Sequence, residues 1–289
     1  MTFIFRLLSR LPLSVLHGIG ALLGWLVYLG SPTYRRHLRQ NLSLAYAGAA
    51  AAPVLRSAVA HAGRGALELP RLWLRPKSEV VSLVTRVSGW EAVEAAWHKG
   101  AGIVFLTPHL GCFEIIAQYY AAHAPVTVLY RPPKQAWLQP IIEEGRGSAN
   151  LRLAPADLSG VRLLMRALKR REAIGILPDQ VPGLGEGMWS GFFGKPAYTM
   201  TLAARLLESS GATLILAYGE RLPGGAGFHL HFSPASESMA GSPESRVAAI
   251  NRELEAVIRR CPGQYLWGYN RYKVPAGVEP PPAAKAGAC

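Results

Sequence analysis

The sequence predicts an α/β fold: a mixed, mostly parallel sheet flanked by helices, with a hydrophobic membrane-anchoring helix at the N-terminus. Short apolar, β-branched runs alternate with longer helical segments from residue 84 onward, which is the pattern of βαβ units. Half of the 289 residues are hydrophobic, so the chain can build one large core. A long apolar run carries no carboxylate, Lys or Arg between Arg10 and Arg35, which suits a membrane.

Residues 11–30 are about long enough to cross a hydrocarbon core of ~30 Å. They are too many for a signal-peptide core, and no clear small-x-small cleavage site follows, so we expect the segment to be retained. Trp25 and Tyr28 suit a membrane interface, whereas Pro12 and four glycines weaken a span. The segment therefore either spans the bilayer or lies in its cytoplasmic leaflet. The alternative is a buried hairpin helix in a soluble protein.

The formal net charge is +13, and the positive excess is concentrated near the N-terminus. No acidic residue precedes Glu68, whereas seven arginines do. Such a balance predicts an anionic partner, and its position beside the apolar segment favours anionic membrane lipids. Aromatic residues do not interleave with the basic run as in single-strand binders, so we expect no nucleic-acid partner.

We predict three parts: a membrane anchor with a basic interfacial helix at 1–45, a catalytic domain at 46–274, and a disordered tail rich in Pro and Ala at 275–289. Helices are predicted from amphipathic periodicity that stops near Gly or Pro, and strands from apolar runs that end at turn residues. The predicted helices cover 32–46, 53–74, 90–98, 114–122, 135–147, 158–170, 197–209 and 244–260. The predicted strands cover 84–88, 102–106, 126–130, 173–177, 213–218 and 229–232.

The apolar strand predicted at 102–106 leads directly to the candidate catalytic residues. Thr107-Pro108 ends it, because Pro cannot donate to a strand ladder. His109 then lies at the strand exit, Gly111 permits a tight turn, and Glu114 lies in the first turn of the next helix. There the Glu114 carboxylate can accept from one ring nitrogen of His109, which leaves the other free as a base. The plainer interpretation is a His that makes only a structural hydrogen bond.

Polar side chains also follow two other strands, and open α/β sheets place their chemistry at this edge. Arg131 follows the strand that ends at Tyr130, and Asp179 and Gln180 follow Pro178. Surface arginines usually just face solvent, and Asp often ends a strand. The shared edge nevertheless favours a binding site.

Anion binding is predicted at two further places. Arg131 and Arg146 can hold a phosphate bidentately. Residues 191–199 precede a predicted helix; their glycines allow close approach of the backbone, and a helix start favours an anion.

The sequence offers no nucleophile of its own. The three cysteines form no CxxC pair, so no metal site is expected, and Cys112 is interpreted as an apolar filler. There is no Gly-x-Ser-x-Gly elbow and no Walker loop. A His–carboxylate pair then indicates that the substrate supplies a hydroxyl, which His109 deprotonates. Arg131 and the backbone N–H groups of the turn at Gly111 are the candidate donors to the oxyanion.

Five motifs occur in order along nearly the whole chain. They are His109-x4-Glu114, Tyr130-Arg131-Pro132, Pro178-Asp179-Gln180, Phe192-Phe193-Gly194-x2-Ala197-x-Thr199 and Tyr265-Leu-Trp-Gly-Tyr-Asn-Arg-Tyr-Lys273. Together they resemble the bacterial lipid A late acyltransferases, the lauroyl and myristoyl transferases of the lysophospholipid acyltransferase superfamily. The first motif alone marks only the superfamily, whereas the ordered set is more specific.

This resemblance implies a glycerolipid acyltransferase-like fold and an O-acyltransferase on the cytoplasmic face of a bacterial inner membrane. Such an enzyme moves a fatty acyl chain from acyl carrier protein, or from coenzyme A, to a hydroxyl of a phosphorylated lipid A precursor, with no cofactor. Relatives that acylate ornithine lipids, lysophospholipids or other glycolipids leave the acceptor open. A further alternative is a protein that binds anionic lipids without catalysis.

The resemblance also implies roles for individual residues. His109 is the general base, and Glu114 is its orienting partner. Seven residues are expected to contact substrate: Arg131 and Arg146 near its anionic groups, Asp179 and Gln180 at the border of the site, and Phe193, Gly194 and Thr199 at the acyl or acceptor pocket.

Overall fold

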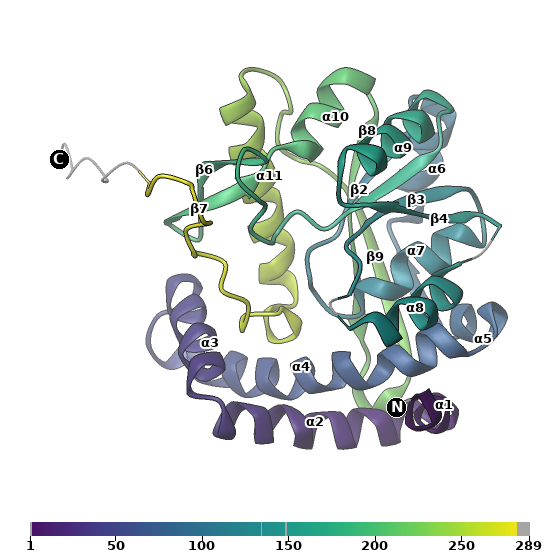
Figure 1. Ribbon diagram of the computed structural model, residues 1–289, viewed down its shortest axis with the longest axis vertical. Helices are drawn as coiled ribbons and strands as arrows, with labels where there is room; N and C mark the ends of the chain where they lie inside the picture. Colours follow the sequence, from purple (N-terminus) through teal and green to yellow (C-terminus); the bar gives the residue numbers. More distant parts are fainter. Residues whose placement is uncertain (1, 134, 148, 282–289) are drawn as a thin grey trace.

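The computed structural model describes residues 2–133, 135–147 and 149–281. A seven-stranded sheet lies at its centre, with strand order β1-β9-β8-β2-β5-β3-β4 (Figure 1). Its strands are β1 (Val84–Ser88), β2 (Ile103–Leu106), β3 (Val126–Tyr130), β4 (Leu151–Pro155), β5 (Ala173–Ile176), β8 (Thr213–Arg221) and β9 (Phe228–Pro234). Only the pairing of β8 with β9 is antiparallel, so the predicted mixed, mostly parallel sheet is confirmed.

Helices cover both faces of this sheet, and a further group lies at its base in Figure 1. The helices are α1 (Thr2–Arg10), α2 (Leu13–Gly30), α3 (Pro32–Ala45), α4 (Ala51–Leu74), α5 (Lys77–Ser82), α6 (Trp90–Lys99), α7 (Phe113–Ala121), α8 (Gln139–Arg146), α9 (Leu158–Lys169), α10 (Leu202–Ser210) and α11 (Pro243–Arg260). Short 3-10 turns lie at Gly48–Ala50, Ala136–Leu138, Pro223–Gly225 and Pro262–Gln264.

Strand β2 explains why this sheet needs two helical layers. All four of its residues are buried, and successive side chains point to opposite faces. Ile103 and Phe105 pack into a cluster with α6 and α7, whereas Val104 and Leu106 pack into one with α9, α10 and α11. A parallel strand buried on both faces reads as a continuous apolar run, which is why the sequence revealed it clearly.

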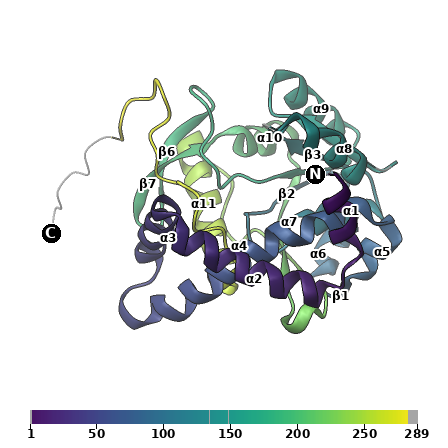
Figure 2. The same ribbon diagram turned by 60° about the horizontal axis from the view of Figure 1, so that its bottom comes forward.

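The N-terminal helices form a layer of their own below the sheet. Helix α2 packs along α4, and Figure 2 shows the two lying side by side at the surface. Gly20 and Gly24 of α2 face Gly63 of α4, and a Cβ on Gly24 would lie 2.2 Å from the carbonyl oxygen of Val59. These glycines therefore allow close approach of two helices. Helix α2 is also long and apolar enough to cross a membrane, by length and composition.

Two segments differ from the sequence prediction. Residues 187–200 form a hairpin of β6 (Gly187–Phe192) and β7 (Lys195–Met200), so the helix predicted from residue 197 begins only at Leu202. The prediction was wrong because the glycines were interpreted as a loop before a helix, whereas Phe193 and Gly194 make the positive-φ turn of an antiparallel pair. Strand β4 was not predicted. Of the expected disordered tail, residues 282–289 lie outside the described part.

Candidate active site

The site forms where β2 leaves the sheet. The backbone N–H of Thr107 still donates to the carbonyl of Ile176 at the end of β5 (3.1 Å), and the chain then turns away. The carbonyl of His109 accepts from the N–H of Leu266 (3.0 Å), which holds the turn from the C-terminal side. His109 therefore lies at the carboxyl edge of the parallel strands, as the sequence predicted.

Asp179, which follows β5, holds His109 through two bonds. Its Oδ1 lies 2.7 Å from Nδ1 of the imidazole, and its Oδ2 accepts from the backbone N–H of His109 at 2.9 Å. Asp179 is 2% exposed. Burial opposes its ionisation, but His109 and Arg271 more than offset that effect, so the pKa of Asp179 is lowered. The carboxylate is therefore charged at neutral pH and can only accept a hydrogen bond.

The other ring nitrogen faces the amide of Gln180. The Gln180 Nε2 lies 3.1 Å from Nε2 of His109. Because Nδ1 donates to Asp179, Nε2 carries the lone pair and accepts from this amide. The structure thus brings together three residues that the sequence placed at one edge.

Glu114 does not orient His109, and that prediction is wrong. Its carboxylate accepts from Nε and Nη2 of Arg146 on α8, the Nε bond being 2.9 Å, and from the indole of Trp73 on α4 (3.3 Å). The guanidinium also lies over the rings of Trp73 and Tyr130. Burial disfavours the charged guanidinium, but Glu114 more than offsets this, so the pKa of Arg146 is raised.

Both clusters open on one cavity of about 390 Å³. Its polar lining comprises His109, Glu114, Gln118, Arg131, Arg146 and Gln180. Its apolar lining comprises Leu69, Trp73, Phe113, Ala117, Val128, Leu129, Leu151, Leu177, Val181, Pro182 and Met200, with Tyr130 and Ala156 completing the wall. An elongated apolar group can therefore lie beside the imidazole. Because Leu69 and Trp73 belong to α4, the cavity adjoins the N-terminal helical layer.

The two predicted anion-binding arginines differ in availability. Arg146 is committed to Glu114, so the expectation that it holds a substrate phosphate is not supported by its geometry. Arg131 lines the cavity, is exposed, and has no ion pair among the described residues. It is the better candidate to meet an anionic group.

The other predicted pocket residues lie elsewhere. Thr199 is buried and accepts from Arg271 (2.8 Å), and Phe193 packs against Trp267 at a centroid distance of 5.4 Å. Neither they nor Gly194 line the cavity. Their motif instead seats the C-terminal segment, because Arg271 also donates to the carbonyl of Tyr198 (2.7 Å).

The turn at residues 109–112, here named the catalytic turn, is held by residues that were not predicted from the sequence. The N–H of Gly111 donates to the carbonyl of Gln264 (3.0 Å), and the N–H of Cys112 donates to the carbonyl of Gly219 (2.7 Å). These N–H groups are occupied, so they are not the free oxyanion donors that the turn was expected to offer. Nothing in the local sequence signals such partners, which lie more than a hundred residues away.

One group of side chains has the spacing of a metal site. Glu220, His229 and His231 place one ligand atom each within 4.8 Å of one another on β8 and β9. None of the three lines the cavity, so this group is separate from His109.

A mostly parallel sheet thus carries a His–carboxylate pair to a partly apolar cavity, an arrangement that suits an α/β enzyme using a base beside an apolar group. A family model described as bacterial lipid A biosynthesis acyltransferase matches residues 1–274, and the chain belongs to this family. It is therefore an enzyme that transfers acyl groups in lipid A synthesis. The resemblance drawn from the sequence motifs is confirmed.

Curated relatives agree with the family. The chain is 27% identical over 281 residues to a lipid A biosynthesis lauroyltransferase of Escherichia coli (strain K12), covering 94% of this chain and 90% of the relative. It is 26% identical over 212 residues to a palmitoleoyltransferase of the same organism, covering 73% and 68%. A lipid A biosynthesis acyltransferase of Haemophilus influenzae (strain Rd) is 26% identical over 285 residues, covering 93% and 88%.

Proposed function

We propose that this enzyme moves a fatty acyl chain from an acyl thioester to a hydroxyl of a phosphorylated lipid A precursor, with His109 as general base and Asp179 as its orienting carboxylate. The observation that carries the proposal is the part-buried contact of 2.7 Å between Nδ1 of His109 and Oδ1 of Asp179, beside the partly apolar cavity. Nε2 of His109 takes the proton of the acceptor hydroxyl while its oxygen attacks the thioester carbonyl. The tetrahedral intermediate then collapses, and the thiolate leaves with that proton.

Gln180 supports this reaction from the other side of the ring. Its amide occupies the position beside Nε2 that the acceptor hydroxyl needs, so the substrate must displace it. Once displaced, the amide can donate to the oxyanion of the intermediate. Among the described residues that line the cavity, Arg131 is the arginine without an ion pair. It would bind a phosphate of the substrate or the oxyanion of the intermediate.

The acyl donor in this proposal is acyl carrier protein, the donor that the resemblance of the sequence motifs implies. Acyl carrier proteins are acidic, and the chain carries a net charge of +13, which would speed their encounter at low salt. Because coenzyme A is also anionic, the two donors are separated by comparing kcat/KM for the two thioesters at one fixed ionic strength.

We further propose that the enzyme lies on the cytoplasmic face of a bacterial inner membrane, with α2 in the leaflet rather than across it. One side of α2 is committed to α4, with Leu16 and His17 buried. The other side exposes Leu22, Leu26 and Leu29. A helix with one packed and one apolar exposed side suits the plane of the interface.

The test measures acyl transfer by the purified full chain in mixed micelles, with product identified by mass spectrometry. The acceptor is a phosphorylated, acylated glucosamine disaccharide, and the donor is a fatty acyl thioester of acyl carrier protein. We expect wild type to form the O-acylated product. The kcat of His109→Ala should be about 10²–10⁴-fold lower, because that is the rate enhancement that a general base typically supplies.

His98→Ala is the matched control, because His98 is exposed on α6 and remote from the cavity. Near-normal turnover by His109→Ala would reject the base assignment. No product from wild type with either thioester would reject the proposed combination of donor and acceptor.

A further inference from the structure

The turn that carries His109 and Gly111 is also held by a side chain on the far side from the substrate site, Arg221, which does not line the cavity. Nη2 of Arg221, on β8, donates to the carbonyl of Gly111 at 2.7 Å. Gly111 has φ +58°, and a Cβ there would lie 2.0 Å from the carbonyl oxygen of Gly219. The turn is therefore pressed against β8 in a conformation that glycine favours. Its carbonyl is two residues from His109, so a shift here moves the imidazole.

Arg221 is itself fixed by a buried ion pair. Its Nε and Nη2 donate to the carboxylate of Glu68, on α4, at 2.8 and 2.6 Å. Glu68 is 1% exposed and Arg221 5%. Burial disfavours the charged form of both side chains. Arg221 nevertheless lowers the pKa of Glu68, and Glu68 raises the pKa of Arg221. The amide side chain of Gln264 also brackets the backbone of Arg221, at 2.9 and 3.0 Å.

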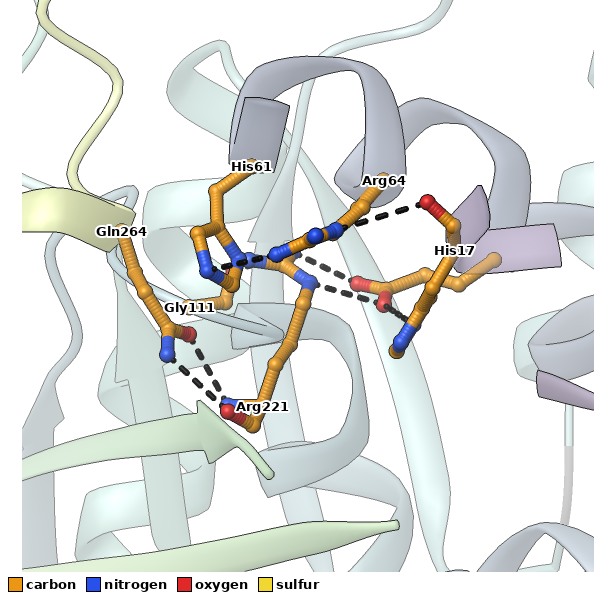
Figure 3. Close-up of polar contacts among 7 residues, drawn as sticks. His17, His61, Arg64, Gly111, Arg221 and Gln264 are labelled. Carbon is orange, nitrogen blue, oxygen red and sulfur yellow. Dashed lines mark hydrogen bonds and ion pairs between the residues drawn. The ribbon is translucent and has the colours of Figure 1, made fainter. Parts of the chain in front are cut away.

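The same carboxylate reaches the helix with the exposed apolar face. Nε2 of His17, on the buried side of α2, lies 3.2 Å from Glu68 Oε2. The contacts form a row from His17 through the Glu68 carboxylate and Arg221 to Gly111. Figure 3 shows His17, Arg221 and Gly111 of this row. The row leaves α2 and α4 and ends at the turn that carries His109, without entering the cavity.

We propose that Arg221 is a positioning residue for His109, held in place by Glu68 and His17, so that the N-terminal helices set the geometry of the catalytic turn. The inference rests on the proposed function for its kinetic consequence. A buried ion pair is weak support for stability, since apolar residues of similar volume often replace it without loss. The carbonyl of Gly111 that Arg221 holds is therefore a better explanation for this pair than stability.

The test replaces both partners at once, with Glu68→Met and Arg221→Met in one chain. This removes the donor to Gly111 and leaves no unpaired charge of the pair. We expect a melting temperature close to wild type, a kcat lower by about a hundredfold, as for a small misplacement of a catalytic group, and an unchanged KM. Hydrogen exchange over residues 109–114 should be faster than in wild type.

A control pair with the same kinds of contact, but with a more exposed carboxylate, lies between α10 and α11. Arg246 donates to Glu208 at 2.6 Å and to the carbonyl of Met239 at 3.1 Å, so it also combines an ion pair with a backbone contact. Glu208→Met with Arg246→Met should leave kcat and exchange at residues 109–114 as in wild type.

Wild-type kcat and wild-type exchange in the folded Glu68/Arg221 double variant would overturn the inference. If that variant does not fold, Glu68→Gln with Arg221→Gln decides instead, because the new amide at position 68 keeps an acceptor for His17 and neither change leaves an unpaired buried charge. An unchanged kcat with unchanged exchange overturns the inference there too. If wild type proves to have no transferase activity, the proposed function fails, and exchange over residues 109–114 still decides whether Arg221 holds the turn.

Discussion

The imidazole of His109 has two nitrogen atoms, and the structure gives them different partners. Nδ1 lies against a charged, buried carboxylate, whereas Nε2 faces the neutral amide of Gln180 beside the cavity. An ionised Asp179 selects the tautomer with hydrogen on Nδ1 and stabilises the imidazolium that forms when Nε2 takes a proton. Asp179 thereby prepares one defined nitrogen for the acceptor hydroxyl.

The carboxylate of Glu114 has a different task. It neutralises the partly buried Arg146 and fixes that side chain against Trp73 and Tyr130. Removing it would leave a partly buried cation without its partner, which destabilises the cavity wall. Loss of activity in a Glu114 variant would therefore reflect a change in the shape of the cavity as well as the loss of a charged group from it.

For individual residues, the sequence correctly predicted which side chains lie close together, but the predicted hydrogen-bond partner of His109 was wrong. His109, Asp179 and Gln180 were found because parallel strands bring their carboxyl ends to one edge. The contact of Glu114 was missed because its partners, Trp73 and Arg146, lie 41 and 32 residues away. Periodicity fixes the face of a helix on which a side chain lies, but it cannot name a distant partner on another helix.

Among the elements, the pair of α2 and α4 makes a sharp prediction. An Ala in place of Gly in a helix normally stabilises by about 0.5–1 kcal/mol. Gly18→Ala should do so, because nothing lies within 4 Å of a Cβ there. Gly24→Ala should instead destabilise by about 1–3 kcal/mol, since its Cβ meets the carbonyl of Val59.

Denaturant unfolding of the two glycine variants provides the measurement. Equal stabilisation by both would show that α2 does not pack on α4 in solution. The glycines of α2 were interpreted from the sequence only as weakening a membrane span. The spacing of Gly20 and Gly24 was the available signal for close helix packing.

Elements buried on both faces were predictable, whereas the edge strand β4 and the β6–β7 hairpin were not. The strands at 103–106 and 173–176 are continuous apolar runs, and both were predicted. Strand β4 lies at the edge of the sheet and mixes exposed with buried residues, so its pattern is weak. The β6–β7 hairpin was taken for the approach to a helix because its pairing depends on contacts with α11 and the C-terminal segment.

The whole molecule presents an apolar surface at one end. Phe3, Ile4 and Leu7 are exposed on α1, and Leu22 and Leu26 are exposed on α2. In Figure 1 these helices lie at the opposite end of the molecule from α9 and α10. Because α4 lines the cavity and packs on α2, binding through this surface would place the cavity beside the membrane.

Introducing negative charges on this apolar surface tests the membrane assignment. Leu22→Glu with Leu26→Glu should weaken binding to anionic phospholipid vesicles by at least about tenfold per residue, since each Leu loses roughly 1.5–3 kcal/mol of burial. Leu158→Glu is the control, because Leu158 is 76% exposed on the distant α9. Sedimentation with vesicles measures the binding, and equal loss in all variants would contradict this orientation.

The most direct test of the account concerns the carboxylate that orients the base. Asp179→Asn keeps the size of the side chain and removes the charge from Nδ1 of His109. We expect the folded variant to transfer acyl chains with a kcat about 10²–10³ lower than wild type, close to the His109→Ala level. A kcat within a few-fold of wild type would contradict the assignment of Asp179 and, with it, the mechanism proposed for His109.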